Sequence, residues 1–419
     1  MKNLRLVSTF VLLLSAATFA DSTPSGMLTL LRQVDYLDNR AKEPMVVEHP
    51  SGTLFVSGYG AGQDGPQTIP RLWKSSDGGN SWNPVKVGDQ ASGASGNSDV
   101  DLAVAPDGTL YLVSMWFDPK TSEGTQIVVG VSVDSGETWR WTTLSKQRFD
   151  DRPWVAVARD GTAHVIWNDG SVYHTMSRDH GRTWSTPKQI CSHGGSSHLA
   201  VSESGDVAVR VTPLSASGNK FTEGVDLVLV SRDGGATWTQ HPVPGERNWA
   251  MWAAGATPRW VEPLAWDSDH HLYLLWTQVD GVWLSRSDDW GTTWKKWRIA
   301  ESHGDTLSYY PYLTARKSGE LAAAWYSGAS ANLHWEVCAL QVGASHSAPQ
   351  SSCSTPLTTD SWSDGDDSKG VAPERDTAGE YLPVAFLRNG DVAVVTPIQN
   401  RTSKRFGFTF WEFKRTPAK

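Results

Sequence analysis

The sequence predicts an all-β protein whose main domain is a seven-bladed β-propeller. Three observations lead to this fold. A two-strand unit occurs seven times, an eight-residue pattern ending in tryptophan occurs five times, and one further strand precedes the first unit. Alternation of apolar and polar residues, typical of strands, is common, and no window of comparable length has the apolar period of a helix.

The first 20 residues are set apart from this domain. Lys2 and Arg5 begin the chain with positive charge, an apolar run follows, and small residues around Ala20 offer a cleavage site. This order is typical of a secretory signal peptide, and the run is shorter than the roughly 20 residues of a membrane span. We therefore expect residues 1–20 to be removed and 21–419 to form one exported propeller domain, periplasmic or secreted.

Each blade is expected to begin with the two-strand unit. Glu43, Arg152 and Tyr310 each precede a proline, and eight residues after that proline a glycine marks the turn between two alternating strands. Four more copies lack the proline or the glycine, and the copy at Glu262 is one residue shorter.

The ring of blades must then close. The seventh unit ends near the C-terminus after three strands, and MLTLLRQV, residues 27–34, precedes the first unit. We expect this N-terminal strand to complete the last blade. A six-bladed ring is the alternative.

The pattern Ser-x-Asp-x-Gly-x-(Ser/Thr)-Trp, called the box below, follows five of the seven units. A tight reversal between the third and fourth strands needs a glycine for positive φ and a carboxylate that accepts turn N–H groups. The tryptophan buries a large surface between neighbouring sheets. A structural role is therefore expected for the box aspartates, which are Asp77, Asp134, Asp179, Asp233 and Asp289.

These patterns resemble the Asp boxes, or BNR repeats, of sialidases and their relatives, over almost the whole of residues 21–419. The resemblance implies the propeller fold but leaves the chemistry open. Such propellers include sialidases, other glycosidases, polysaccharide lyases and non-catalytic binding proteins, and fold alone does not choose among them.

The start of each innermost strand is expected at the mouth of the central channel, on the face opposite the boxes. Reading round the ring, these positions are Glu43, Asp99, Arg152, Ser196, Glu262, Tyr310 and Tyr381.

The resemblance to sialidases implies roles for several of these residues. A phenol attacks well only when a base takes its proton, and the planar guanidinium of arginine suits a substrate carboxylate. On this basis Tyr310 is the nucleophile, Glu262 its base and Asp99 the acid, with Asp151 as a substitute. The expected substrate-binding residues are Arg152, Arg210, Arg259, Glu43, Tyr381, Trp249 and Trp252. The family's Phe/Tyr-Arg-Ile-Pro motif is absent.

The best single expectation for function is exo-α-sialidase-type hydrolysis of an anionic glycan. One alternative is a non-catalytic propeller that binds glycan or protein. The other is a lyase of uronic-acid polysaccharides, in which His164, His174 or His198 would move the proton and Arg152 would neutralise the carboxylate.

Composition narrows the choice of partners. The net charge is −8, and removal of Lys2 and Arg5 makes it −10, with no basic cluster, which argues against nucleic acid. No Cys/His group has zinc spacing, so no metal and no cofactor are expected.

Cys338 and Cys353 are expected to form a disulfide, leaving Cys191. The Ser/Thr/Asp-rich segment of about 343–379 is expected to be a loop insertion on the site face.

Overall fold

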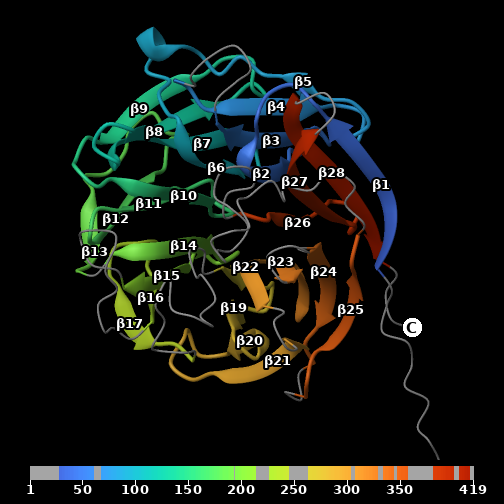
Figure 1. Cartoon of the computed structure of the whole chain (residues 1–419). Coiled ribbons are helices and arrows are strands. Elements are labelled where there is room, and N and C mark those ends of the chain that lie inside the picture. The colour runs from blue at the N-terminus through green and yellow to red at the C-terminus, as the bar shows by residue number, and fades with distance from the viewer. Residues whose placement is uncertain are drawn as a thin grey trace, which may run out of the picture.

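The computed structural model describes residues 28–60, 68–192, 194–213, 226–244, 263–302, 307–328, 334–343, 347–356, 381–400 and 405–415. The predicted signal peptide lies outside these residues. The strands form seven four-stranded antiparallel sheets arranged around a central axis (Figure 1). The predicted seven-bladed propeller is therefore confirmed, and the six-bladed alternative is wrong.

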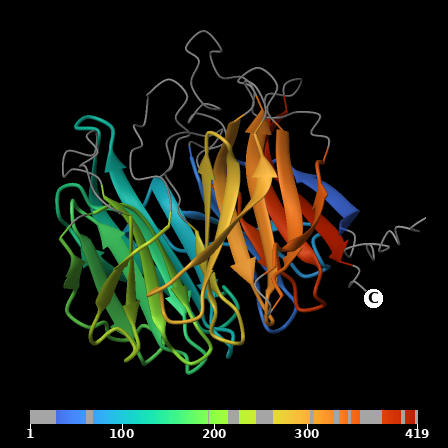
Figure 2. The same cartoon turned by 90° about the horizontal axis from the view of Figure 1, so that it is seen from below.

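Within each blade the strands follow one another outward from the centre, and in side view they run along the ring axis (Figure 2). Blades 1 and 2 are β2 (Lys42–Glu48), β3 (Leu54–Tyr59), β4 (Arg71–Ser75) and β5 (Asn83–Pro84), then β6 (Ser98–Val104), β7 (Leu110–Asp118), β8 (Glu123–Ser132) and β9 (Arg140–Ser145). Blades 3 and 4 are β10 (Asp151–Val157), β11 (Ala163–Asn168), β12 (Val172–Ser177) and β13 (Lys188–Cys191), then β14 (Gly195–Val201), β15 (Val207–Pro213), β16 (Leu227–Ser231) and β17 (Thr239–Pro242).

Blades 5 and 6 are β18 (Leu264–Trp266), β19 (Leu272–Gln278), β20 (Gly281–Ser287) and β21 (Lys295–Glu301), then β22 (Leu307–Ala315), β23 (Glu320–Gly328), β24 (His334–Gln341) and β25 (Gln350–Ser354). Blade 7 is β26 (Val384–Phe386), β27 (Val392–Asn400), β28 (Arg405–Arg415) and β1 (Leu28–Tyr36). A short 3-10 turn, η1 (Gln90–Ser92), precedes blade 2.

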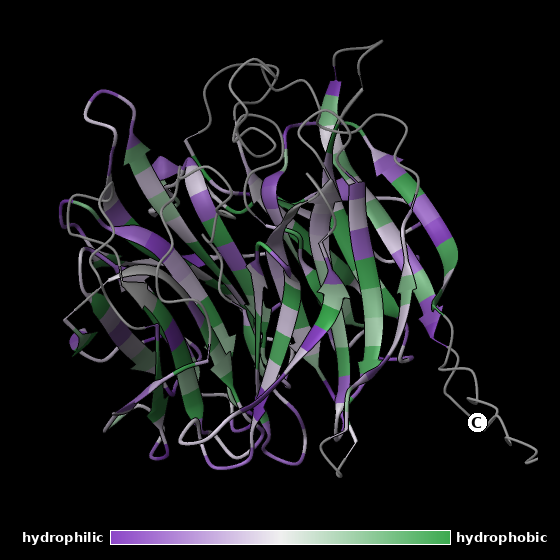
Figure 3. Cartoon of the chain, turned by 60° about the horizontal axis from the view of Figure 1, so that its bottom comes forward, coloured by the Kyte–Doolittle hydropathy of each residue, from purple (hydrophilic) through white to green (hydrophobic). Residues whose placement is uncertain are grey.

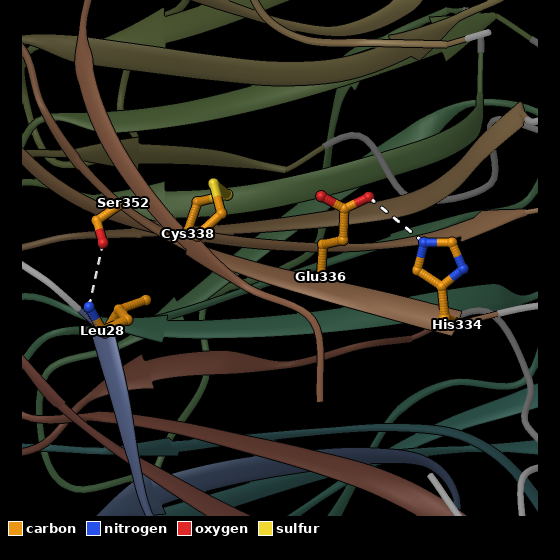
Figure 4. Close-up of a disulfide and its surroundings, with 6 residues drawn as sticks. Leu28, His334, Glu336, Cys338 and Ser352 are labelled. Atoms are coloured by element: carbon orange, nitrogen blue, oxygen red, sulfur yellow. Dashed lines mark hydrogen bonds and ion pairs between the residues drawn. A yellow bond between two sulfur atoms is a disulfide. The ribbon is translucent and has the colours of Figure 1, made fainter. Parts of the chain in front are cut away.

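The N-terminal strand closes the ring, as the sequence predicts. β1 pairs antiparallel with β28, from Leu28 opposite Arg415 to Tyr36 opposite Phe408. Figure 4 shows a second contact, in which the Leu28 N–H donates to Ser352 Oγ of β25 at 3.1 Å. The first strand therefore completes blade 7 and also bonds to the outer strand of blade 6.

The two-strand units share an unusual backbone at their start. The register of β2, β10 and β22 shifts by one residue against the next strand, which marks a β-bulge. At each bulge the residue before the proline is left-handed, with φ of 47° at Glu43, 49° at Arg152 and 46° at Tyr310. Residues other than glycine rarely adopt this conformation, and such strain clusters at functional sites.

The turn inside the unit has one geometry in six of the seven blades, the exception being blade 6, where the Glu320 N–H donates to the Lys317 carbonyl. Gly52 has φ of 86°, and its N–H donates to the His49 carbonyl. The unit of blade 5 has no glycine, and there His270 adopts φ of 63° and donates to the Asp267 carbonyl. The same turn therefore forms with a histidine in the strained position.

Each box fixes its turn with one set of hydrogen bonds. In blade 3, Asp179 accepts from Ser177 Oγ at 2.8 Å and from the N–H and Oγ1 of Thr183 at 2.9 and 2.6 Å. Ser177 Oγ in turn accepts from the Gly181 N–H at 2.8 Å. The other four box carboxylates accept from the corresponding groups: Asp77, Asp134, Asp233 and Asp289.

The boxes also join each blade to the one before it. A Cβ added at Gly181 would lie 2.6 Å from Val131 of blade 2, and one at Gly291 would lie 2.8 Å from Val228 of blade 4. The blade 1 box packs Trp82 against Phe408 of blade 7, with ring centroids 5.1 Å apart. Glycine is therefore needed in the box for close blade packing as well as for its backbone conformation.

Two blades lack a box, and each has another connection. The outer strand of blade 7 comes from the N-terminus, so no turn joins it to β28. In blade 6 a disulfide joins Cys338 of β24 to Cys353 of β25 at directly paired positions (Figure 4). The predicted pairing is confirmed, and Cys191 is buried in β13.

β25 corrects one expectation about the chain. It lies inside the segment of about 343–379 that the sequence suggested was a loop, so residues 350–354 are instead the outer strand of blade 6. Residues 357–380 lie outside the described part of the chain.

In Figure 3 hydrophobic residues concentrate along the strands and hydrophilic ones in the connections. No helix among the described residues is long and apolar enough to cross a membrane.

We predict that Asp179→Ala lowers the thermal midpoint of unfolding, because the turn loses three hydrogen bonds to its carboxylate. Hydrogen bonds from Thr183 hold the pKa of Asp179 at about 2. This stabilisation is therefore present above the unfolded pKa of roughly 4 and is lost as the pH falls toward about 2. The difference between variant and wild type should shrink over that range, whereas Asp269→Ala, an exposed turn residue, should change little.

We also predict that Cys338→Ala/Cys353→Ala lowers the free energy of unfolding by about 3 kcal/mol, because the bond closes a loop with a sequence separation of 15 residues. Guanidinium unfolding monitored by tryptophan fluorescence measures the change. A reducing agent should destabilise the wild type and leave the double variant unaffected. Equal stability of both proteins without reductant would contradict the prediction.

Candidate functional site

The candidate site lies at the central channel, where the innermost strands of blades 1, 2 and 3 begin. Strands alternate in direction within a blade, so this end lies opposite the box turns. β2, β6 and β10 bring Glu43, Asp99, Asp151 and Arg152 together there. These four residues are called the carboxyl cluster below.

The carboxyl groups of the cluster interact with one another. Asp99 lies within interaction range of the carboxyl groups of both Glu43 and Asp151. Arg152 Nε lies 3.7 Å from Asp151 Oδ2. Two ionised carboxylates repel each other, so carboxyl groups placed this close favour a proton between them. The cluster is therefore built to hold a proton.

Burial supplies the physical reason. It raises the pKa of Asp99 to about 7, the charge of Glu43 adds to this rise, and the Arg152 guanidinium opposes it. Although part of the Asp151 side chain is exposed, the channel wall around it removes water from the carboxyl group and raises its pKa to about 7, against Arg152 and with a contribution from Asp99. Carboxyl groups with pKa values near neutrality suit proton transfer at neutral pH.

The members of the cluster differ in access. Glu43 and Asp99 are buried, whereas 44 % of the Asp151 side chain is exposed, against 10 % for Arg152. Asp151 is therefore the carboxyl group that a ligand reaches, and the other two lie behind it.

Aromatic side chains lie beside the cluster. The Trp154 ring is 4.4 Å from His198 and 5.0 Å from Tyr381, and Tyr312 contacts both of the latter. Burial raises the pKa of Tyr381 well above its usual value, and the charges of Asp99 and Glu43 raise it further. Burial lowers the pKa of His198 to about 3, so both rings are neutral at neutral pH.

Several polar atoms of this aromatic group have no hydrogen-bond partner among the described residues. They are Trp154 Nε1, His198 Nδ1 and Tyr381 Oη. Buried polar groups are nearly always bonded in folded proteins, so each of these atoms needs a partner such as a buried water.

The fold agrees with that of solved propellers. The α-L-arabinofuranosidase of Fusarium graminearum in complex with arabinobiose matches with a TM-score of 0.51 and 14% identity, covering 92% of this chain and 98% of that one. This is the fold of the sialidase-like Asp-box propellers.

Other solved structures share this sialidase-like propeller fold. A protein of unknown function from Dyadobacter fermentans matches with a TM-score of 0.50 and 13% identity, over 93% of this chain and 99% of that one. YCF48 bound to D1 peptide also matches with a TM-score of 0.50, at 14% identity over 94% and 97%. Neither the protein-family models nor the curated proteins gave a match.

The propeller brings together five residues expected at its site: Glu43, Asp99, Asp151, Arg152 and Tyr381. Tyr310 is buried in the same core cluster as Tyr381. Its expected base Glu262 lies outside the described residues, as do Arg259, Trp249 and Trp252. The pair of nucleophile and base therefore stays a prediction.

Arg210 lies elsewhere in the propeller. Its side chain is fully buried, Nη1 donates to the Leu275 carbonyl of blade 5 at 3.0 Å, and Nη2 lies 3.5 Å from the Asp226 carboxylate. We therefore assign Arg210 to the contact between blades 4 and 5, and not to substrate binding as the sequence suggested.

Two of the histidines expected in a lyase also lie away from the channel. His164 Nδ1 and His174 Nε2 are 3.0 Å apart in blade 3, and the ring of His174 packs against Trp238 of the blade 4 box. Burial lowers their pKa values to about 4 and about 3. Of the three histidines, His198 is the one beside the carboxyl cluster.

The sequence reasoning missed Asp101, Trp154 and Tyr312. Each lies two residues after a predicted channel position, so the register of the repeat contained the signal. Asp101 accepts from the backbone N–H groups of Leu102 and Val155, both at 2.8 Å, and so bonds blade 2 to blade 3. Among the residues that the structure describes, no group of three His, Cys, Asp or Glu side chains could hold a metal ion.

We predict that the thermal midpoint falls as the pH rises from about 4 to about 7. A raised pKa favours the protonated folded state, so its stabilisation is full below the unfolded pKa and is lost as the pH passes the folded value. Asp99→Asn should flatten this slope, whereas Asp269→Asn, an exposed aspartate of blade 5, should preserve it. An unchanged slope in Asp99→Asn would show that Asp99 titrates normally.

Proposed function

We propose that the protein is a glycoside hydrolase that acts on a neutral saccharide at the mouth of the propeller channel. One observation carries the proposal: an accessible carboxyl, Asp151, interacts with a buried carboxyl, Asp99, which interacts with a third, Glu43. Glycoside hydrolysis uses one carboxyl group as acid and another as carboxylate.

Asp151 fits the acid. Its pKa of about 7 leaves a large share of the group protonated near neutral pH, and its exposure allows contact with a glycosidic oxygen. It would donate its proton to that oxygen as the bond to the sugar carbon breaks. Water then supplies the hydroxyl group of the new reducing end, and its second proton restores Asp151.

Glu43 and Asp99 would supply negative charge from behind Asp151. The oxocarbenium-like transition state develops positive charge on the sugar ring, and a negative charge beside it lowers the barrier. Each close pair of carboxyl groups needs only one proton between its two members. The cluster of three therefore keeps a negative charge even when Asp151 is protonated.

Charge favours a neutral saccharide over the anionic one expected from the sequence. Among the described residues, the cluster sets one guanidinium, Arg152, against three carboxyl groups. Arg152 already faces Asp151, so a substrate carboxylate would meet repulsion from the cluster. The sialidase expectation depends on Glu262 and Arg259, which lie outside the described residues.

The proposal is tested by hydrolysis of neutral glycosides by the full chain. Arabinobiose and the p-nitrophenyl α-L-arabinofuranoside are the first substrates, because a solved protein of this fold carries the name α-L-arabinofuranosidase. Asp151→Asn should lower kcat/KM for the disaccharide by roughly 10²- to 10⁴-fold. It should lower kcat/KM much less for the p-nitrophenyl substrate, whose leaving group needs no acid. Asp99→Asn should impair both.

Asp269→Asn, far from the channel in blade 5, is the matched control and should keep wild-type rates. Equal loss on both substrates in Asp151→Asn would remove its role as acid. Turnover of a fluorogenic sialoside, with none of neutral glycosides, would overturn the neutral substrate and favour the sialidase expectation.

A further inference from the structure

A cavity lies outside the channel, between the outer parts of blades 2 and 3 (β9, β11 and β12 in Figure 1). Its volume is about 410 Å³, within the usual range for pockets that hold small ligands. The residues that matter for recognition are Leu144, Lys146 and Gln147 of blade 2 and its following connection, and Trp167, Asp169 and Tyr173 of blade 3.

One wall of this cavity is aromatic. Trp167 and Tyr173 are directly paired across β11 and β12, and their rings stack with centroids 5.9 Å apart and planes inclined by 16°. Trp167 is buried and Tyr173 is partly exposed, so Trp167 supports the ring that a ligand meets. Leu144 adds apolar surface from the other blade.

The other residues that line the cavity are polar, and hydrogen bonds fix the position of Asp169 among them. The Asp169 carboxylate interacts with the Tyr173 phenol and accepts from the Ser171 N–H at 3.2 Å. Lys146 and Gln147 are exposed at the rim. The cavity therefore offers an aromatic face, a carboxylate, an amide and an amine within one space.

A buried carboxyl group positions the rim. Asp150 has no exposed surface, and it accepts from Ser145 Oγ at 2.9 Å and from the Gln147 N–H at 2.8 Å. The next two residues along the chain are Asp151 and Arg152 of the carboxyl cluster. One short segment therefore connects the cavity to the channel site.

We propose that this cavity binds a saccharide ring, stacked on Tyr173 and hydrogen-bonded by Asp169, Lys146 and Gln147. An aromatic face packs against the C–H groups of a sugar, and polar groups beside it bond to the hydroxyls. The proposal goes beyond the proposed function, because binding here requires no bond cleavage. The cavity would hold a saccharide chain beside the channel.

Blade 5 provides a matched control for the aromatic pair. Trp276 and Trp283 are paired and stacked in the same way, with centroids 6.3 Å apart, and Trp283 Nε1 donates to Asp280 at 2.9 Å. This pair does not line the cavity between blades 2 and 3. Trp283→Ala therefore removes an equivalent stacked ring from another blade.

Isothermal titration of the full chain with arabinobiose, and separately with cellobiose, tests the proposal. Tyr173→Ala should weaken saccharide binding by about tenfold through loss of stacking, and Gln147→Ala should weaken it in a protein with an unchanged fold. Trp283→Ala should bind like the wild type. Because Asp151→Asn alters the channel and not the cavity, it should also keep cavity binding while losing hydrolysis.

The outcomes separate the two sites. Saccharide affinities that stay unchanged at every binding site in both Tyr173→Ala and Gln147→Ala would overturn the cavity proposal, and so would the absence of binding by wild type to either probe. Loss of binding in Asp151→Asn alone would place the saccharide in the channel. Hydrolysis without cavity binding would leave the proposed function intact and remove the second site.

Discussion

The pairing of β1 with β28 is the constraint on which the rest of the propeller depends. Each blade packs only on its two neighbours, so an open row of blades would expose an apolar sheet face at both ends. The N-terminal strand fixes the last blade to the first part of the chain through nine residues of antiparallel sheet. Polar contacts accompany it, since Thr409 Oγ1 donates to Asp35 at 2.8 Å and Arg32 lies 3.3 Å from Glu412.

Contacts between blades repeat round this closed ring, and their chemistry varies. Five turns use the box, in which a carboxylate holds the turn while a glycine lets it approach the preceding blade. Blade 6 uses a covalent bond at the same place, between its third and fourth strands. The contact of blades 4 and 5 adds the buried guanidinium of Arg210. Different residues therefore meet one requirement, which is to fix outer strands against a neighbour.

The channel site follows from the same repetition. Every unit begins at the same height on the axis, so residues that are about 50 positions apart in sequence become neighbours. Three of them have a strained left-handed backbone, and the surrounding sheets hold it. Crowding carboxyl groups there removes water from them and raises their pKa values to about 7. The fold thus creates acid chemistry that no single segment contains.

The sequence by itself determined the repeat, the number of blades, the closing strand, the box turns and the cysteine pair. These features depend on local spacing and on the alternation of residues along strands. It also marked Glu43, Asp99, Arg152 and Tyr381 as channel residues, because their position in the unit is local information. The signal for Trp154 and Tyr312 lay two residues further on in the same register and was not used.

Only the tertiary structure decided which of the marked residues meet. Asp151 joins Asp99 and Glu43, whereas Arg210 turns into the packing of blades 4 and 5 and His174 packs under the blade 4 box. The cavity at Tyr173 likewise exists only between two blades. The physical reason is that burial and charge interactions depend on neighbours across blades, which are distant in sequence and specified by no local pattern.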